Sequence, residues 1–269
     1  MPAESVTVAV IGGSGLYSLF DPAESERRVV ETPYGAATVT IGELAGRRIA
    51  FLTRHGADHS VAPHQINFRA NIWALASLGV RAIVSSSAVG GVHPDYPPGT
   101  LVLTDQFIDR TNGRADTFFD GDSVQHLAAA DPFCPTLLAI ARDVVPDLTP
   151  SGTVVVIQGP RFSTRAESLW FRAAGAHTIN MTMYPEVALA AELNIGTANL
   201  SFVTDSDAGL SPEAGSEDQV SHQLVLRRLL DAQPRIVEAI TKIVGAIPED
   251  YEPRELIPAE AVAAILDRA

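Results

Sequence analysis

Residues 154–168 combine a strand, a break and a helix start, and this order restricts the fold more than any other stretch. Val154-Val155-Val156-Ile157 is a β-branched run typical of a buried strand. Gly159-Pro160 ends it, because proline has no amide hydrogen for a sheet ladder. Thr164 and Glu167 have the spacing of a helix capping box. Open α/β sheets bind ligands in such strand-to-helix loops, although an ordinary turn with exposed arginines explains this stretch equally well.

Apolar runs alternate with helical patterns along the rest of the chain. Strands are predicted at 6–11, 28–30, 37–41, 48–53, 82–84, 100–103, 154–157, 177–180 and 197–203, and helices at 67–78, 137–145, 163–174, 186–193 and 216–244. This alternation predicts an α/β protein with a mixed, largely parallel central β-sheet flanked by helices. We find no linker or repeat, so we predict a single domain over residues 1–269 with a helical tail at about 249–269.

The charge balance restricts the class of partner. The chain has 269 residues and a formal charge of −13, which argues against nucleic acid or an anionic membrane surface. An anionic substrate would therefore need a local cluster of donors and cations. There is one cysteine, Cys134, no signal-peptide pattern at the first ten residues, and no apolar run as long as a membrane span. We expect a cytoplasmic protein.

Polar segments follow five of the predicted strands. If the strands are parallel neighbours, the segments converge on one crevice. The segments are Gly12-Gly13-Ser14-Gly15, Arg54-His55-Gly56, Ser85-Ser86-Ser87-Ala88, Asn180-Met181-Thr182 and Thr204-Asp205-Ser206-Asp207.

Five side chains of these segments together describe a phosphate site: Ser14, Arg54, His55, Ser87 and Thr182. Arginine offers a bidentate fork, histidine adds a donor, and the hydroxyls are neutral donors. The glycine turn matches neither the dinucleotide motif nor the Walker motif, and no cluster has metal-ligand spacing. A tight turn and a surface pair remain the alternatives for the first two segments.

Asp205 and Asp207 are two residues apart, so they would share one face of a strand. A carboxylate accepts from an amino group, and a partly buried, protonated carboxyl donates to a ring nitrogen. Phe162 can stack on a flat heterocycle, or it belongs to the core.

These residues carry a resemblance to a known family. The chain resembles the trimeric purine nucleoside phosphorylases, and most closely their 5′-methylthioadenosine phosphorylase branch. The matching stretches are IGGSGLY (11–17), TRHG (53–56), INFRANIWAL (66–75), SSAVG (86–90), LTDQFIDRT (103–111), DPFCP (131–135), QGPRFSTRAES (158–168), INMT (179–182) and YPE (184–186).

The resemblance implies a single-domain nucleoside phosphorylase fold, a homotrimer, and no metal or organic cofactor, with inorganic phosphate as co-substrate. It implies that phosphate is held by Ser14, Arg54, His55, Ser87, Ala88 through its backbone, and Thr182. It implies nucleoside contacts from Met181, Phe162 and the two aspartates. Asp205 would bond purine N7, and Asp207 would help to read the 6-amino group. His126, on the polar segment 111–133, would reach the 5′ pocket of a neighbouring subunit.

The implied reaction is phosphorolysis of S-methyl-5′-thioadenosine to adenine and 5-methylthio-ribose 1-phosphate. The phosphate dianion stabilises an oxocarbenium-like sugar and then attacks C1′, and an acid near N7 neutralises the leaving purine. The resemblance assigns that acid to Asp205, with Asp207 and His55 as the other catalytic candidates.

Three alternatives remain open. His222 corresponds to a position at which hydroxyl-preferring relatives have histidine, which would favour adenosine. The 6-oxopurine branch carries asparagine where Asp205 stands, so a 6-oxopurine nucleoside phosphorylase is the alternative that this aspartate disfavours. The same fold would also permit a non-catalytic nucleoside- or phosphate-binding protein.

Overall fold

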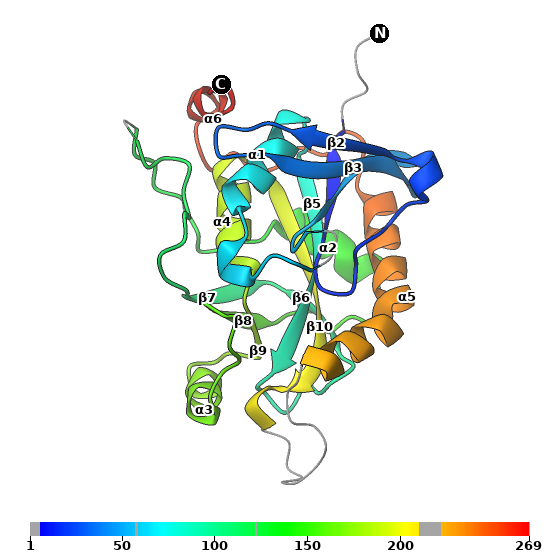
Figure 1. Cartoon of the computed structure of the whole chain (residues 1–269), viewed down its shortest axis with the longest axis vertical. Helices are drawn as coiled ribbons and strands as arrows, with labels where there is room; N and C mark the ends of the chain where they lie inside the picture. Colours follow the sequence, from blue (N-terminus) through cyan, green and yellow to red (C-terminus); the bar gives the residue numbers. More distant parts are fainter. Residues whose placement is uncertain (1–5, 57–58, 122, 210–221, 269) are drawn as a thin grey trace.

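The computed structural model describes residues 6–56, 59–121, 123–209 and 222–268, and the predicted helical residues 216–221 lie outside it. Within these residues, a ten-stranded mixed sheet forms the centre of the protein (Figure 1). Its strands are β1 (Val8–Gly12), β2 (Glu26–Val30), β3 (Ala37–Leu44), β4 (Arg47–Thr53), β5 (Ala82–Gly91), β6 (Leu101–Thr104), β7 (Gln106–Arg110), β8 (Thr153–Ile157), β9 (Thr178–Asn180) and β10 (Gly196–Ser206).

Helices cover both faces of this sheet. They are α1 (Phe68–Ser77), α2 (Pro135–Val144), α3 (Arg165–Ala173), α4 (Met183–Glu192), α5 (His222–Ala246) and α6 (Ala259–Leu266). The predicted capping box at the start of α3 is present, because Thr164 and Glu167 each accept a backbone hydrogen bond from the other. The α/β fold class with a mixed sheet and flanking helices is therefore confirmed.

The sheet combines parallel and antiparallel strand pairs. β1 lies between β4 and β5, and β10 pairs with the other side of β5, all in parallel. β8 is also parallel to both β7 and β9. The pairs β2–β3, β3–β4, β5–β9 and β6–β10 are antiparallel. The predicted parallel character therefore holds within two groups of strands, β4–β1–β5–β10 and β7–β8–β9. The first group aligns the carboxyl ends of four strands.

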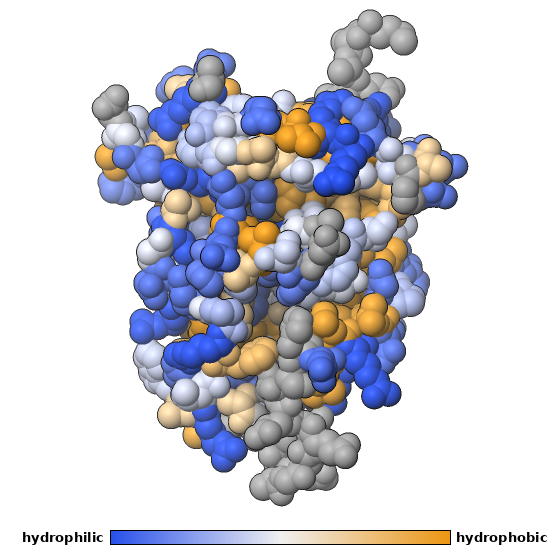
Figure 2. All heavy atoms as spheres, viewed as in Figure 1, coloured by the Kyte–Doolittle hydropathy of each residue, from blue (hydrophilic) through white to orange (hydrophobic). Residues whose placement is uncertain are grey.

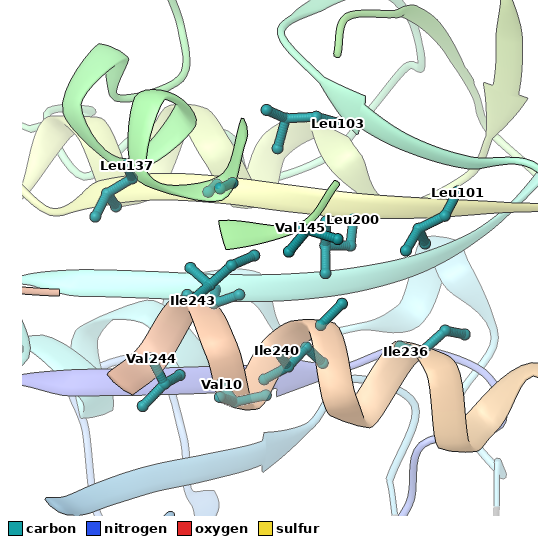
Figure 3. Packing of buried hydrophobic residues seen from close by; sticks show 14 of the residues in the cluster. Val10, Leu101, Leu103, Leu137, Val145, Leu200, Ile236, Ile240, Ile243 and Val244 are labelled. Atoms are coloured by element: carbon teal, nitrogen blue, oxygen red, sulfur yellow. The ribbon is translucent and has the colours of Figure 1, made fainter. Parts of the chain in front are cut away.

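Side chains of the central strands alternate between two cores, as the period of two in a strand requires. Val8 and Val10 pack with α2 and α5, while Ala9 and Ile11 pack with α1, α4 and α6. Figure 3 shows the first core, in which side chains of α5 such as Ile240 meet Val10 and Leu200 of the sheet. The strands are apolar on both faces because both faces are covered.

Two strands are longer than the sequence indicates. Ser85–Ala88 continues β5, and residues 204–206 continue β10, so these polar segments are strand and not loop. Their polar side chains are tolerated inside the sheet because they bond to one another: Asn199 donates to both Ser85 and Ser87. β7 is a strand that the sequence analysis did not predict, because its polar residues hide the pattern.

The tail packs against the main body. Asn194 bonds to the backbone of Ile257, and the Trp73 indole donates to the Ile265 carbonyl at 3.1 Å. The predicted helix is present as α6, whereas residues 249–258 contain no regular element. No helix in the described part of the chain is long and apolar enough to cross a membrane. Hydrophilic residues cover much of the face seen in Figure 2, and the hydrophobic ones lie in separate patches.

Candidate active site

A cavity of about 360 Å³ lies where the central strands end. Ten residues that the sequence analysis selected line it together: Ser14, Arg54, His55, Ser87, Ala88, Phe162, Met181, Thr182, Asp205 and Asp207. The predicted convergence of the five segments is therefore correct. Other parts of the wall come from Val61, Pro63, Gly90, Asn180, Thr204 and Val225.

Topology explains why the segments meet. β4, β1, β5 and β10 are parallel neighbours, so four segments start from one edge of the sheet. β9 is antiparallel to β5, which the prediction did not anticipate. Its partners on β5 are Gly90 and Gly91, at the far end of that long strand, and β9 runs back toward Ser87. Thr182 therefore reaches the same cavity from the opposite direction.

An irregularity in β10 shapes the wall of the cavity. The register opposite β5 passes from Val203 to Asp205 while β5 advances by one residue, so Thr204 is extra. In a regular strand two successive side chains would point to opposite faces. Because a bulge reorients the chain, both Thr204 and Asp205 line the cavity. Asp207 follows Ser206 in a short 3₁₀ turn. The prediction that the two aspartates share one face of a strand is therefore wrong, although both side chains line the cavity.

The two carboxyl groups lie close together around Gly90. A Cβ built on Gly90 would stand 3.1 Å from Oδ1 of Asp207 and 3.2 Å from Oδ1 of Asp205. Both side chains are buried. Two carboxyl groups at one buried site are stabilised when one of them carries a proton, because two like charges repel. Glycine at position 90 leaves the space that this arrangement needs.

The environment of Asp207 favours its protonated form. Burial raises its pKa, and the charge of Glu167 adds to the rise. The Ser168 hydroxyl, which donates to Oδ2 of Asp207, opposes it. Asp205 is held differently: Oγ1 of Thr204 donates to its Oδ2 at 2.7 Å.

Arg54 is buried and engaged by a partner that the sequence analysis missed. Its Nε and Nη2 donate to the two carboxylate oxygens of Glu186 at 2.6 and 2.7 Å, and Nη1 donates to the Ser86 carbonyl at 2.9 Å. The predicted bidentate fork is therefore directed at Glu186, while Nη1 and Nη2 each keep one further N–H. The sequence offered a reason to select Glu186. A buried arginine needs a counter-ion, and Glu186 is the one acidic residue at the start of an alanine-rich helix.

His55 is a neutral imidazole at neutral pH, because burial lowers its pKa to about 4. The positive charges of Arg54 and His59 act in the same direction, and the hydrogen bond to Val61 acts against them. Nδ1 lies 2.9 Å from the Val61 carbonyl, so Nδ1–H donates there and Nε2 accepts. In this neutral form the ring offers Nε2 as an acceptor, whereas the sequence analysis expected a donor, and a role of His55 toward phosphate stays a prediction. A bound anion would have to supply or attract a proton at Nε2.

His59 is a second histidine of the cavity that the sequence analysis did not select. Its ring centroid is 4.5 Å from that of His55, and its Nδ1 is hydrogen-bonded to the Tyr17 hydroxyl at 3.0 Å. No motif pointed to it. The chain returns to His55 at Val61, whose N–H donates to the His55 carbonyl at 3.1 Å, and His59 lies just before this contact.

The loop after β8 forms one wall. Phe162 lines the cavity with 39 % of its surface exposed, so it belongs to the rim and not to the core. Arg161 donates to both oxygens of Glu167, as expected for bracing residues. Arg114, which the sequence analysis did not select, stabilises this wall through hydrogen bonds. Its Nη2 donates to the carbonyls of Gln158 and Met181 at 3.1 and 2.9 Å.

Two predicted contacts are not part of the cavity as described. His126 is exposed on the irregular segment that the sequence analysis predicted at 111–133. His222 begins α5, and its side chain lies outside the described residues.

The depressed pKa of His55 makes stability depend on pH. Unfolded histidine takes up a proton below about pH 6.5, whereas folded His55 does so only near pH 4. Stability is therefore lost as the pH falls through this window. Between pH 7 and pH 5 the wild-type protein should lose about 2 kcal/mol more unfolding free energy than His55→Asn. Urea denaturation of both proteins at the two pH values measures this difference, and equal losses would contradict the assignment.

Comparison with known proteins places this cavity in a family context. A model of the phosphorylase superfamily matches residues 7–245. A purine nucleoside phosphorylase of Streptomyces coelicolor is 46 % identical over 259 residues, which cover 91 % of this chain and 90 % of that protein. An S-methyl-5′-thioadenosine phosphorylase of Mycolicibacterium smegmatis is 50 % identical over 210 residues, 77 % of this chain and 80 % of that one.

The fold agrees with these sequence matches. A structure of methylthioadenosine phosphorylase from Schistosoma mansoni in complex with adenine superimposes with a TM-score of 0.84 at 32 % identity, and the match covers 97 % of each chain. A family model over most of the chain, together with relatives of this identity and coverage, shows that the chain belongs to the phosphorylase superfamily.

Proposed function

We propose that this protein is an S-methyl-5′-thioadenosine phosphorylase, which converts its nucleoside and inorganic phosphate to adenine and 5-methylthio-ribose 1-phosphate. Enzymes of that name are similar to it in sequence and in fold. The observation that carries the choice of base is the carboxyl pair Asp205 and Asp207 around Gly90.

One proton shared by two carboxyl groups provides one donor and one acceptor. The N7 and 6-amino edge of adenine presents one acceptor and one donor, whereas the same edge of a 6-oxopurine presents two acceptors. A singly protonated pair therefore matches adenine and leaves a carboxylate opposite the oxygen of a 6-oxopurine. Burial favours the shared proton on Asp207 in the protein alone. In this assignment the proton stands on Asp205 when the base is bound, so that Asp205 donates to N7 of the leaving base and Asp207 helps to read the 6-amino group.

We assign phosphate to the opposite part of the cavity wall. The donors proposed to hold it are the remaining N–H groups of Arg54, the hydroxyls of Ser14, Ser87 and Thr182, and the backbone of Ala88. Glu186 already compensates the charge of Arg54, so the bound dianion keeps its own negative charge. That charge stabilises the oxocarbenium-like sugar, and a phosphate oxygen then attacks C1′. No metal or organic cofactor is needed for these steps.

We assign the sugar and its 5′ substituent to the remaining wall. Met181 would lie against the ribose, Phe162 against the base or sugar, and apolar Val61 and Val225 suit a methylthio group. His222 would be placed to bond a 5′-hydroxyl, which is the argument for adenosine as an additional substrate.

We further propose a cytoplasmic homotrimer in which His126 completes a neighbouring active site. Exposed apolar side chains support a protein interface: Val124 is 68 % exposed beside His126, and Leu169 and Trp170 on α3 are 49 % and 53 % exposed. Exposed large apolar side chains of this kind are found at subunit contacts.

A purine nucleoside phosphorylase is the second candidate, because one relative that covers most of the chain carries that name. The substrate comparison below separates the two functions.

The test of function compares methylthioadenosine, adenosine and inosine, each with and without phosphate. We expect adenine release from methylthioadenosine to require phosphate. For inosine, kcat/KM should be lower by a factor of about 100 or more, since the carboxyl pair leaves O6 without a donor. Product chromatography measures this. Preference for inosine would establish the second candidate, and release without phosphate would contradict phosphorolysis.

The role of Asp205 is tested by Asp205→Asn. Loss of the acid should lower kcat/KM for methylthioadenosine about 10²- to 10⁴-fold, while the amide, which donates to O6, should raise inosine turnover relative to adenine nucleosides. Asp143→Asn removes an exposed carboxylate of α2 and is the matched control. An unchanged ratio of the two substrates in Asp205→Asn would refute the role.

A further inference from the structure

A buried polar network runs behind the wall of the cavity and ends at Ser87. It joins five side chains of three adjacent strands, β6, β10 and β5: Thr104, Ser201, Asn199, Ser85 and Ser87. Asn199 is fully buried at 0 % exposure, and none of the other four exceeds 5 %. The strand register creates the network, since Asn199 stands opposite Ser85, and Ser201 stands opposite Ser87, along the parallel pair.

The hydrogen bonds of this network have a single direction. Ser201 donates its only hydroxyl proton to Oδ1 of Asn199 at 2.8 Å. The bond of 2.8 Å between Thr104 and Ser201 must therefore be donated by Thr104. Nδ2 of Asn199 uses its two protons on Oγ of Ser85 at 2.8 Å and Oγ of Ser87 at 3.0 Å. The hydrogen bonds of the network thus run from β6 through β10 to the two serines of β5.

This direction determines what Ser87 can do. Its oxygen accepts from Asn199, so its own proton is available for another acceptor. Ser87 lines the cavity, and Ser85 does not belong to that lining among the described residues. Bonds in such a chain polarise one another, which makes the terminal hydroxyl a better donor to an anion.

We propose that Asn199 is a positioning residue that commits the Ser87 hydroxyl to donate to phosphate. The proposal rests on the assignment of phosphate to Ser87 in the proposed function and extends it to residues that touch no substrate. With the amide turned over, Asn199 would accept from Ser87, and the serine proton would be withdrawn from the anion. The bond that Ser201 donates to Oδ1 of Asn199 stabilises the orientation present in the structure.

The direct test is Asn199→Asp, which keeps the shape of the side chain and removes the donating NH₂. The introduced carboxylate accepts from Ser85 and Ser87, so the Ser87 proton turns away from the cavity. We expect KM for phosphate to rise about 10- to 100-fold, as for a lost hydrogen bond to a charged group, with KM for the nucleoside changed less than threefold. Ser201→Ala, which lets the amide turn over, should raise KM for phosphate by a smaller factor.

A double-mutant cycle separates positioning from a general structural effect. In the Ser87→Ala background, Asn199→Asp and Ser201→Ala should no longer change KM for phosphate. Ser85→Ala removes the other acceptor of Asn199 and is the matched control, with KM for phosphate within twofold of wild type. Calorimetric titration with inorganic phosphate gives the same comparison without turnover, so failure of the proposed reaction and failure of this proposal are distinguishable.

The outcomes decide the proposal even if Asn199→Asp does not fold, since Ser201→Ala removes only one hydroxyl. A rise in KM for phosphate that disappears in the Ser87→Ala background supports it. An unchanged phosphate affinity in the folded variants overturns it, and so does an equal rise in both backgrounds.

Discussion

The parallel pairing of β5 with β10 is the constraint on which the rest of the site depends. The two strands pair from Ala82 and Gly196 to Gly91 and Ser206 at the centre of the sheet. β5 carries the proposed phosphate hydroxyl of Ser87, and β10 carries Asp205. Their register sets the distance between the proposed phosphate site at Ser87 and the proposed base site at Asp205. The bulge at Thr204 turns the end of β10 into the cavity.

The charged groups of the cavity are neutralised within the site itself, in a protein whose formal charge is −13. The cation of Arg54 is balanced by Glu186 with two short hydrogen bonds, and His55 is neutral. The proposed anion site therefore relies on oriented neutral donors around one compensated guanidinium. Such a site holds phosphate by hydrogen bonds and leaves its negative charge to act on the sugar. The buried network behind Ser87 and the carbonyls held by Arg114 are the supports that keep these donors in place.

The sequence predicts features that depend on neighbouring residues. The glycine turn after β1, the apolar runs of the central strands and the capping box of α3 all follow from local pattern. The convergence of Ser14, Arg54, Ser87 and Asp205 followed from the rule for parallel strand ends, whereas Thr182 arrives from the antiparallel β9. Features that depend on distant pairing were missed: Glu186 lies 132 residues from Arg54, and the Val61 carbonyl that fixes the His55 tautomer lies on a turn without a motif. The bulge at Thr204 is visible only in the register against β5.

The central claim is that one cavity holds phosphate against Arg54 and Ser87 and an adenine base against Asp205 and Asp207. A crystal structure with phosphate and a non-reactive methylthioadenosine analogue tests it most directly. The account predicts phosphate oxygens within hydrogen-bond distance of Arg54 and Ser87, and the N7 and 6-amino edge of the base facing the two carboxyl groups. Phosphate bound elsewhere, or a base turned away from these carboxyl groups, would contradict it.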